Sequence, residues 1–130
     1  MRIAPLLLAT LVGCAAPRRP MAVEAVSGVK TLEELMRVQA TYADPQFRKI
    51  DDVLAEADFA ALIDAAQHLQ AAARRLPAFS KGAEFDALTG RLDEQAHSLE
   101  SAARAKDASA ARQALTAMRQ VCKSCHTRFR

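Results

Sequence analysis

The sequence is poor in the residues that β-sheets, large aromatic cores and charge-driven binding need. It contains no Trp, one Tyr and five Phe, and aromatic residues make up only 5% of 130 residues. Four Gly and five Pro leave little material for the tight turns that connect β-strands. The net charge of +3 is too small to favour nucleic-acid binding. These shortages favour an all-α protein without a nucleic-acid partner.

What the sequence has in quantity is Ala and Leu, which are good helix formers. Hydrophobic residues account for 51% of the chain, and a length of 130 residues suits one small domain. Basic and acidic residues are interspersed, so we expect most of them to solvate helix faces.

The apolar stretch at residues 3–12 is too short to cross a bilayer and is typical of a signal peptide. It ends in Leu11-Val12-Gly13-Cys14, which resembles a bacterial lipobox. The resemblance implies a signal peptide over residues 1–13 and lipid attachment to Cys14. Because Ala15 stands where an Asp would retain a lipoprotein in the inner membrane, it also implies an outer-membrane anchor. The alternative is ordinary signal cleavage near Ala15, which would give a soluble periplasmic protein.

The mature chain divides into a lipidated Cys with a flexible tether, residues 14–30, and a helical domain, residues 31–130. Thr31-Leu32-Glu33-Glu34 matches a capping box, which predicts a helix to about Tyr42. Asp44-Pro45 is expected to interrupt it and to start a short second piece, and the two pieces are either separate helices or one kinked helix. Three longer helices are expected after Asp58, Gly82 and Asp107, with Pro77 ending the first of them. This pattern predicts an antiparallel four-helix bundle.

The last predicted helix carries Cys122-Lys123-Ser124-Cys125-His126, the C-x-x-C-H pattern of covalent haem attachment. Each thiol adds to one haem vinyl group, and the imidazole ligates the iron. With about 100° per helical residue, Cys125 and His126 lie roughly 60° and 40° to either side of Cys122. Two covalent anchors and one axial ligand therefore point into one sector.

Two other interpretations of this motif are weaker. A redox-active disulfide of this spacing usually sits in a βαβ context, which the sequence does not offer. A structural zinc site needs about four ligands, and only these three cluster because Cys14 is far away in the chain. The motif therefore predicts one covalent haem c.

At this point the sequence resembles the class II c-type cytochromes, that is, the cytochrome c-prime family and its low-spin relatives. The resemblance is most specific at residues 122–130, where His126 is followed by two variable residues and then by the aromatic Phe129 and the basic Arg130. Members of that family carry the motif on the last helix of a four-helix bundle. The resemblance implies a haem held between the first and last helices, with His126 as axial ligand, and often a homodimer.

The residue of the first helix that faces the iron decides the function that the resemblance implies. Met36 is the candidate sixth ligand, since Glu34-Leu35-Met36 resembles the ligand segment of low-spin relatives. His/Met ligation suits an electron carrier. If Leu35 faces the iron instead, the iron is five-coordinate and binds NO or CO, and Met36 only fills the core.

Other side chains receive smaller roles. Arg130 is a candidate contact of a haem propionate or of the proximal side, and the alternative is a terminal charge that favours the helix dipole. Arg37 and Arg48 are further candidate propionate partners. Helical position predicts that Met118 lies in the core and that His68 and His97 face solvent. We expect Tyr42 to pack.

Together these observations predict a monohaem electron carrier in the bacterial cell envelope. It would exchange electrons with redox partner proteins and perform no enzymatic reaction, since no acid/base pair is recognisable. It is expected in the periplasm, touching the membrane only through an N-terminal lipid, and a homodimer is among the expectations. Capture or sensing of NO or CO is the alternative function.

Overall fold

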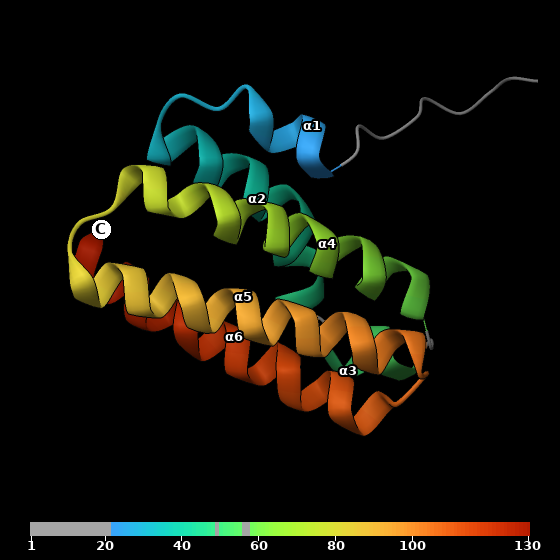
Figure 1. The fold of residues 1–130 in the computed structure, drawn as a ribbon. Coiled ribbons are helices and arrows are strands. Elements are labelled where there is room, and N and C mark those ends of the chain that lie inside the picture. The colour runs from blue at the N-terminus through green and yellow to red at the C-terminus, as the bar shows by residue number, and fades with distance from the viewer. Residues whose placement is uncertain (1–21, 49, 56–57) are drawn as a thin grey trace, which may run out of the picture.

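The computed structural model describes residues 22–48, 50–55 and 58–130, and most of them are helical (Figure 1). The predicted signal peptide, Cys14 and the first part of the predicted tether lie outside these ranges. Within them, no helix has the length and apolar character that crossing a membrane requires.

Four long helices form an antiparallel bundle: α2 (Leu32–Arg48), α4 (Phe59–Arg75), α5 (Ala83–Arg104) and α6 (Ala108–Phe129). Helix α5 packs along both α4 and α6, and α2 packs against α4 and α6 (Figure 1). Shorter elements are α1 (Ala22–Ser27), α3 (Ile50–Ala55) and the 3-10 turn η1 (Leu76–Phe79). The described residues contain no strand. The predicted all-α four-helix bundle, with the motif on its last helix, is therefore confirmed.

The predicted cap residues begin the helices. Thr31 Oγ1 accepts a hydrogen bond from the Glu34 amide at 3.2 Å, and Glu34 Oε2 accepts one from the Thr31 amide at 3.3 Å. This reciprocal pair is the predicted capping box of α2. Asp58 accepts from the Ala61 amide at 3.0 Å, and Asp107 from the Ala110 amide at 2.9 Å. Each cap satisfies an amide that would otherwise lack a partner in the first turn.

The two pieces expected around Asp44-Pro45 belong to one helix, because α2 continues through Pro45 to Arg48 without interruption. A proline inside a helix removes one amide donor and crowds the preceding turn. The helix tolerates this because its inner face is packed along the bundle, with Leu35 fully buried and Ala43 only 2% exposed. Packing of an amphipathic face contributes more to helix stability than local propensity does.

Helix α1 occupies part of the segment that was expected to be a flexible tether. It packs against α4, beside α2 (Figure 1), and both Val26 and Val29 are buried. The Arg75 guanidinium of α4 donates a hydrogen bond to the Val29 carbonyl at 2.9 Å. Residues 22–29 are therefore folded onto the bundle, and the structure differs from the prediction here.

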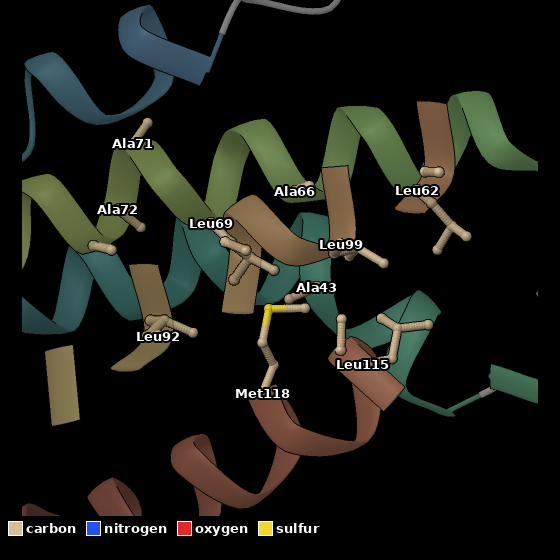
Figure 2. Close-up of a cluster of buried hydrophobic side chains, with 14 of the residues drawn as sticks. Ala43, Leu62, Ala66, Leu69, Ala71, Ala72, Leu92, Leu99, Leu115 and Met118 are labelled. Atoms are coloured by element: carbon tan, nitrogen blue, oxygen red, sulfur yellow. The ribbon is translucent and has the colours of Figure 1, made fainter. Parts of the chain in front are cut away.

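The core consists of Leu and Ala with a few larger side chains (Figure 2). Met118 is fully buried among these residues, as predicted. Small Ala side chains on α4 let neighbouring helices approach closely. The largest fully buried side chains are Phe85, Leu35, Leu62, Leu69, Leu99, Leu115 and Met118.

His68 is buried, with 4% of its surface exposed, so the prediction that it faces solvent is wrong. Its Nδ1 donates to the Asp64 carbonyl at 2.8 Å, and its ring stacks on Tyr42 with the ring centres 3.4 Å apart. The physical reason is that α4 is covered by α1 and α2 as well as by α5, so its buried sector is wider than its apolar stripe. His97 is exposed and Tyr42 packs, both as predicted.

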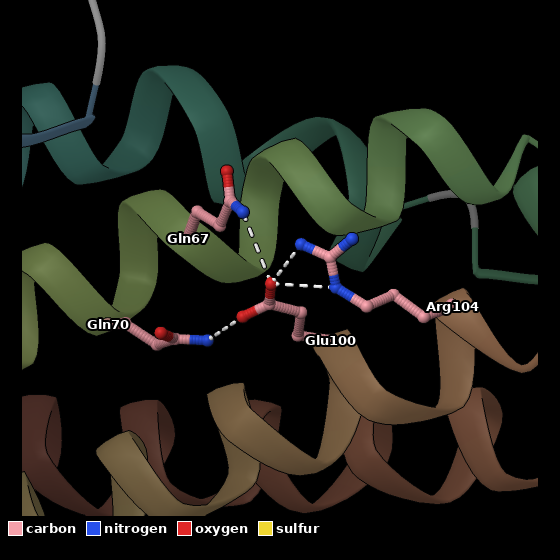
Figure 3. Close-up of polar contacts among 4 residues, drawn as sticks. All are labelled: Gln67, Gln70, Glu100 and Arg104. Atoms are coloured by element: carbon pink, nitrogen blue, oxygen red, sulfur yellow. Dashed lines mark hydrogen bonds and ion pairs between the residues drawn. The ribbon is translucent and has the colours of Figure 1, made fainter.

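A polar network centred on Glu100 ties α5 to α4 (Figure 3). One carboxylate oxygen accepts from the Gln70 amide at 2.6 Å, and the other accepts from Gln67 at 3.1 Å and Arg104 at 2.6 Å. These donors, Gln70 first and Arg104 next, lower the pKa of Glu100 to about 2 against the opposing effect of burial. The network therefore favours the charged carboxylate.

Glu100→Gln is expected to destabilise the fold by about 1–2 kcal/mol at neutral pH, because it removes the charged acceptor. A carboxylate whose folded pKa is lowered contributes stability above its unfolded pKa near 4.5 and loses it as the pH falls toward 2. Urea unfolding at pH 7, 4 and 2.5 should show the difference between wild type and variant shrinking with pH. Glu94→Gln removes the same charge from an exposed position of α5 and should have no such effect. A constant difference across this pH range would contradict the assignment.

Candidate functional site

A cavity of about 690 Å³ lies between α2, α5 and α6, and we call it the motif cavity. Its volume is within the range of about 300–1,000 Å³ that is typical of small-molecule and cofactor sites. Because the bundle is antiparallel, the start of α2, the start of α5 and the end of α6 meet there. Its apolar wall includes Leu32, Met36, Leu76, Phe85, Leu88, Leu92, Val121 and Phe129.

All three functional residues of the motif line this cavity from α6. Cys122 and Cys125 are half-buried, and His126 is exposed at the cavity. Helix α6 runs without interruption to Phe129, which keeps the three side chains in one sector, as the spacing predicts. Phe129 anchors this last turn, because its ring packs edge to face on Phe85 of α5 with the ring centres 5.3 Å apart. Lys81 Nζ also donates to the Phe129 carbonyl at 3.1 Å.

The two thiols do not have the character of redox-active cysteines. Burial, and to a smaller extent the neighbouring Cys125 and Asp44, raise the pKa of Cys122 to about 11. Burial also raises the pKa of Cys125, although Lys81 opposes the effect. Catalytic and redox-active cysteines have a lowered pKa, which stabilises the thiolate. The disulfide interpretation therefore loses support.

The zinc interpretation also lacks support in the structure. Among the residues that the structure describes, no group of three or more His, Cys, Asp or Glu side chains is placed to hold a metal ion. The two thiols and the imidazole line a large apolar cavity and do not surround one point. This arrangement suits a flat ligand to which the two thiols and the imidazole each bond at a different atom.

Met36 and Leu35, the two alternatives on the first long helix, differ in position. Met36 is half-buried and lines the motif cavity, whereas Leu35 is fully buried in the core and does not line it. Adjacent helical residues diverge by about 100°, so only one of them can face a given site. The sequence pattern left this choice open.

The three arginines that are candidates for contact with a haem propionate occupy different positions in the structure. Arg130 lines the motif cavity. Arg37 does not line it and instead pairs with Glu33 at 3.0 Å on the exposed side of α2. The side chain of Arg48 lies outside the described part of the chain.

Sequence reasoning gave no role at the site to six polar residues that line the cavity: Glu33, Gln39, Asp44, Thr89, Arg119 and Lys123. Gln39 stands three residues after Met36, and its buried Oε1 has no hydrogen-bond partner among the described residues. Arg119 and Lys123 precede His126 by seven and three residues, which places them on the same side of α6. That spacing was visible in the sequence, but nothing in it indicated that this face would border a cavity.

The residues of the motif cavity fit the expected haem. Two thiols can form the thioether bonds, an imidazole can ligate the iron, and a thioether lies on α2. The apolar wall suits a porphyrin, and Arg119, Lys123 and Arg130 provide positive charge for carboxylate groups. Gln39 Oε1 adds a buried polar atom at this site without a hydrogen-bond partner among the described residues, whereas buried polar atoms normally have one.

Comparison with known proteins gives one match. A protein-family model described as Cytochrome C' matches residues 29–130, which is most of the chain. The matched range includes Met36 and the whole motif, and it begins after α1. No curated protein and no solved structure matches the chain significantly.

Proposed function

Since the chain belongs to the cytochrome c' family, we propose that it is a monohaem c-type cytochrome that carries single electrons in the bacterial cell envelope. Bound haem supplies an iron that gains or loses one electron. In this proposal Cys122 and Cys125 hold the haem covalently and His126 is its proximal axial ligand. The protein transfers electrons and transforms no substrate, so it is not an enzyme.

The position of Met36 is the observation that supports an electron carrier over a gas-binding protein. Its side chain lines the same cavity as His126, while Leu35 is directed into the core. A thioether in the sixth position would exclude small gases and raise the reduction potential, as His/Met ligation does in other cytochromes. Met36 is therefore proposed as the sixth ligand.

The remaining cavity residues are proposed to control water and charge. Leu88, Leu92 and Phe85 present an apolar wall, which would keep water from the site. A dry site of low dielectric strengthens every electrostatic interaction within it. Arg130 is proposed to contact a propionate or the proximal side, since it lines the cavity one turn beyond His126.

The lipobox resemblance supports a location on the periplasmic side of the envelope, with Cys14 lipidated and anchored in the outer membrane. The 1–13 segment would be removed during export. The partners are proposed to be redox proteins that meet the domain there, and the family resemblance supports a homodimer. Globomycin-sensitive processing and radiolabelled palmitate incorporation would test the anchor, with Cys14→Ala as the unlabelled control.

Met36→Ala is expected to convert a six-coordinate, low-spin haem spectrum into a five-coordinate, high-spin one. The reduced wild type should not shift with carbon monoxide, whereas the reduced variant should shift at once, because an open iron position binds the gas. The measurement is the optical spectrum of protein matured by a c-type haem assembly system, reduced, with and without carbon monoxide.

Met118→Leu is the matched control, because it removes the other buried thioether of the bundle from a site outside the motif cavity. Its spectrum should remain that of the wild type. If the wild type is already high-spin and shifts with carbon monoxide, Met36 is only a packing residue and gas binding becomes the leading function.

A further inference from the structure

The charged residues of this protein are unevenly divided between its last helix and the rest of the chain. Residues 108–130 contain five Lys or Arg and no Asp or Glu. Residues 22–107 contain ten Lys or Arg and fifteen Asp or Glu. The expected interspersion of charges therefore holds for the earlier helices and fails for α6. The domain is an electrostatic dipole whose positive side is the helix that carries the haem motif.

Most of this positive charge lies along one face of α6. Arg112, Arg119 and Lys123 are spaced by seven and four residues, and Arg130 follows seven residues later. At about 100° per residue, all four fall within about 40° around the helix axis. We call these four residues the cationic stripe. Arg119, Lys123 and Arg130 also line the motif cavity, so the stripe follows its rim.

The three stripe residues at the cavity are exposed and have no ion-pair partner in the part of the chain that the structure describes. Arg112, at the far end of the stripe, is paired with Asp51, and Arg128, outside the stripe, is paired with Glu84 at 2.9 Å. No salt bridge to Arg119, Lys123 or Arg130 occurs among the described residues, and all three are exposed. Their charges are therefore available to a partner from outside.

We propose that the cationic stripe is the docking surface for an acidic redox partner protein, which it orients with the motif cavity toward the partner. The proposal rests on the electron-carrier function proposed above and adds the chemical class of the partner. Glu33 and Asp44 also line the cavity, from α2, and Glu33 is paired with Arg37, so the charge of one sign is confined to the α6 rim. A surface region of one sign of charge steers oppositely charged molecules and raises association rates. Complementary charge also sets the orientation of the two partners at encounter.

The stripe fits a protein better than an anionic membrane. Membrane-surface helices pair basic residues with exposed large apolar residues that insert into the bilayer. The other exposed residues of α6 between Arg112 and Arg130 are all polar and include no large apolar residue: Gln113, Thr116, Gln120, Ser124, His126, Thr127 and Arg128. Haem carboxylates within the cavity would neutralise at most two of the three stripe residues that have no ion pair among the described residues, so the α6 rim would keep a positive charge.

The test uses the haem-loaded protein and a reduced plant-type [2Fe–2S] ferredoxin, a small acidic protein that donates one electron. One electron leaves the ferredoxin cluster and reduces ferric haem to ferrous haem, with no proton transferred and no bond formed. Stopped-flow spectroscopy gives the second-order rate constant. The double variant Arg119→Glu/Lys123→Glu is expected to lower this constant by about tenfold or more at low ionic strength. At 1 M salt, where the Debye length is about 3 Å, wild type and variant should agree.

The matched control is Arg74→Glu/Lys106→Glu, which makes the same change in net charge at exposed positions outside the motif cavity. Its rate constant should stay within about twofold of the wild type, because these two charges lie outside the surface that is proposed to meet the partner. Haem content and optical spectrum are measured for every variant, so a loss of haem is seen directly. The wild-type rate alone should fall as salt is added, which tests the proposal even without a folded variant.

An equal loss of rate in both double variants would overturn the proposal, because net charge and not the stripe would then determine association. An unchanged rate in the stripe variant would also overturn it. In that case, stripe-dependent binding to vesicles containing phosphatidylglycerol would assign the stripe to a lipid surface instead. The optical spectrum with carbon monoxide tests the electron-carrier function separately, because binding of the gas to the iron does not depend on residues 119 and 123.

Discussion

The double variant Cys122→Ser/Cys125→Ser is expected to lose covalent haem almost completely. Both thiols line the motif cavity from one helix, and each is proposed to form one thioether bond. A hydroxyl cannot replace a thiol in this bond. After denaturing electrophoresis, haem-dependent peroxidase staining of the protein band should fall by at least about tenfold relative to the wild type, because haem without thioether bonds dissociates when the bundle unfolds.

Ser124→Ala is the control for this prediction. Ser124 lies between the two cysteines on the exposed side of α6 and does not line the motif cavity. Its haem stain should equal that of the wild type. Full staining of the double Ser variant would contradict covalent attachment at these residues, and a parallel loss in the control would indicate that any change in α6 disturbs maturation.

Leu115→Ala is expected to destabilise the domain by about 3 kcal/mol. Leu115 is fully buried where α6 meets the Leu and Ala core (Figure 2). Truncation removes apolar contacts and leaves a cavity that rigid helices fill only in part. For a domain of about 100 residues, this corresponds to a decrease in Tm of roughly 10–20 °C. Thermal unfolding followed by circular dichroism at 222 nm measures it.

Thr116→Ala provides the matched comparison, because it truncates the next residue of α6, which is exposed. Exposed substitutions of this kind usually change stability by less than about 0.5 kcal/mol. If Leu115→Ala unfolds at the same temperature as the control, Leu115 is not part of the folding core. The optical spectrum of the folded variant should remain that of the wild type, since Leu115 does not line the motif cavity.

The motif residues, Met36 and the three basic residues that lack an ion pair among the described residues line one cavity at one end of the bundle. The deep core around Leu115 and Met118 and the Glu100 network lie along the rest of the helices. Stability and function therefore depend largely on different residues. The variants proposed to test stability and the variants proposed to test function should accordingly change different measurements. The family match over residues 29–130 covers both parts.

The sequence by itself determined the helical class, the bundle and the site on α6. Local chemistry was sufficient for this, because a capping box at Thr31 and Asp residues at 58 and 107 begin helices wherever an amphipathic segment follows. The motif residues also follow from sequence alone, since they lie within five positions of one helix. Helical geometry over so short a distance does not depend on the remainder of the fold.

Only the tertiary structure decided features that depend on how helices cover one another. Met36 rather than Leu35 lines the cavity because of the way α2 is rotated about its axis relative to α6. The 3.6-residue period of apolar residues in the sequence does not determine that rotation to within one residue. His68 is buried because α1 and α2 cover a second side of α4. Pro45 remains helical because packing offsets its missing hydrogen bond. The cationic residues of α6 acquire their role only from the cavity beside them, which exists because segments distant in the sequence meet there.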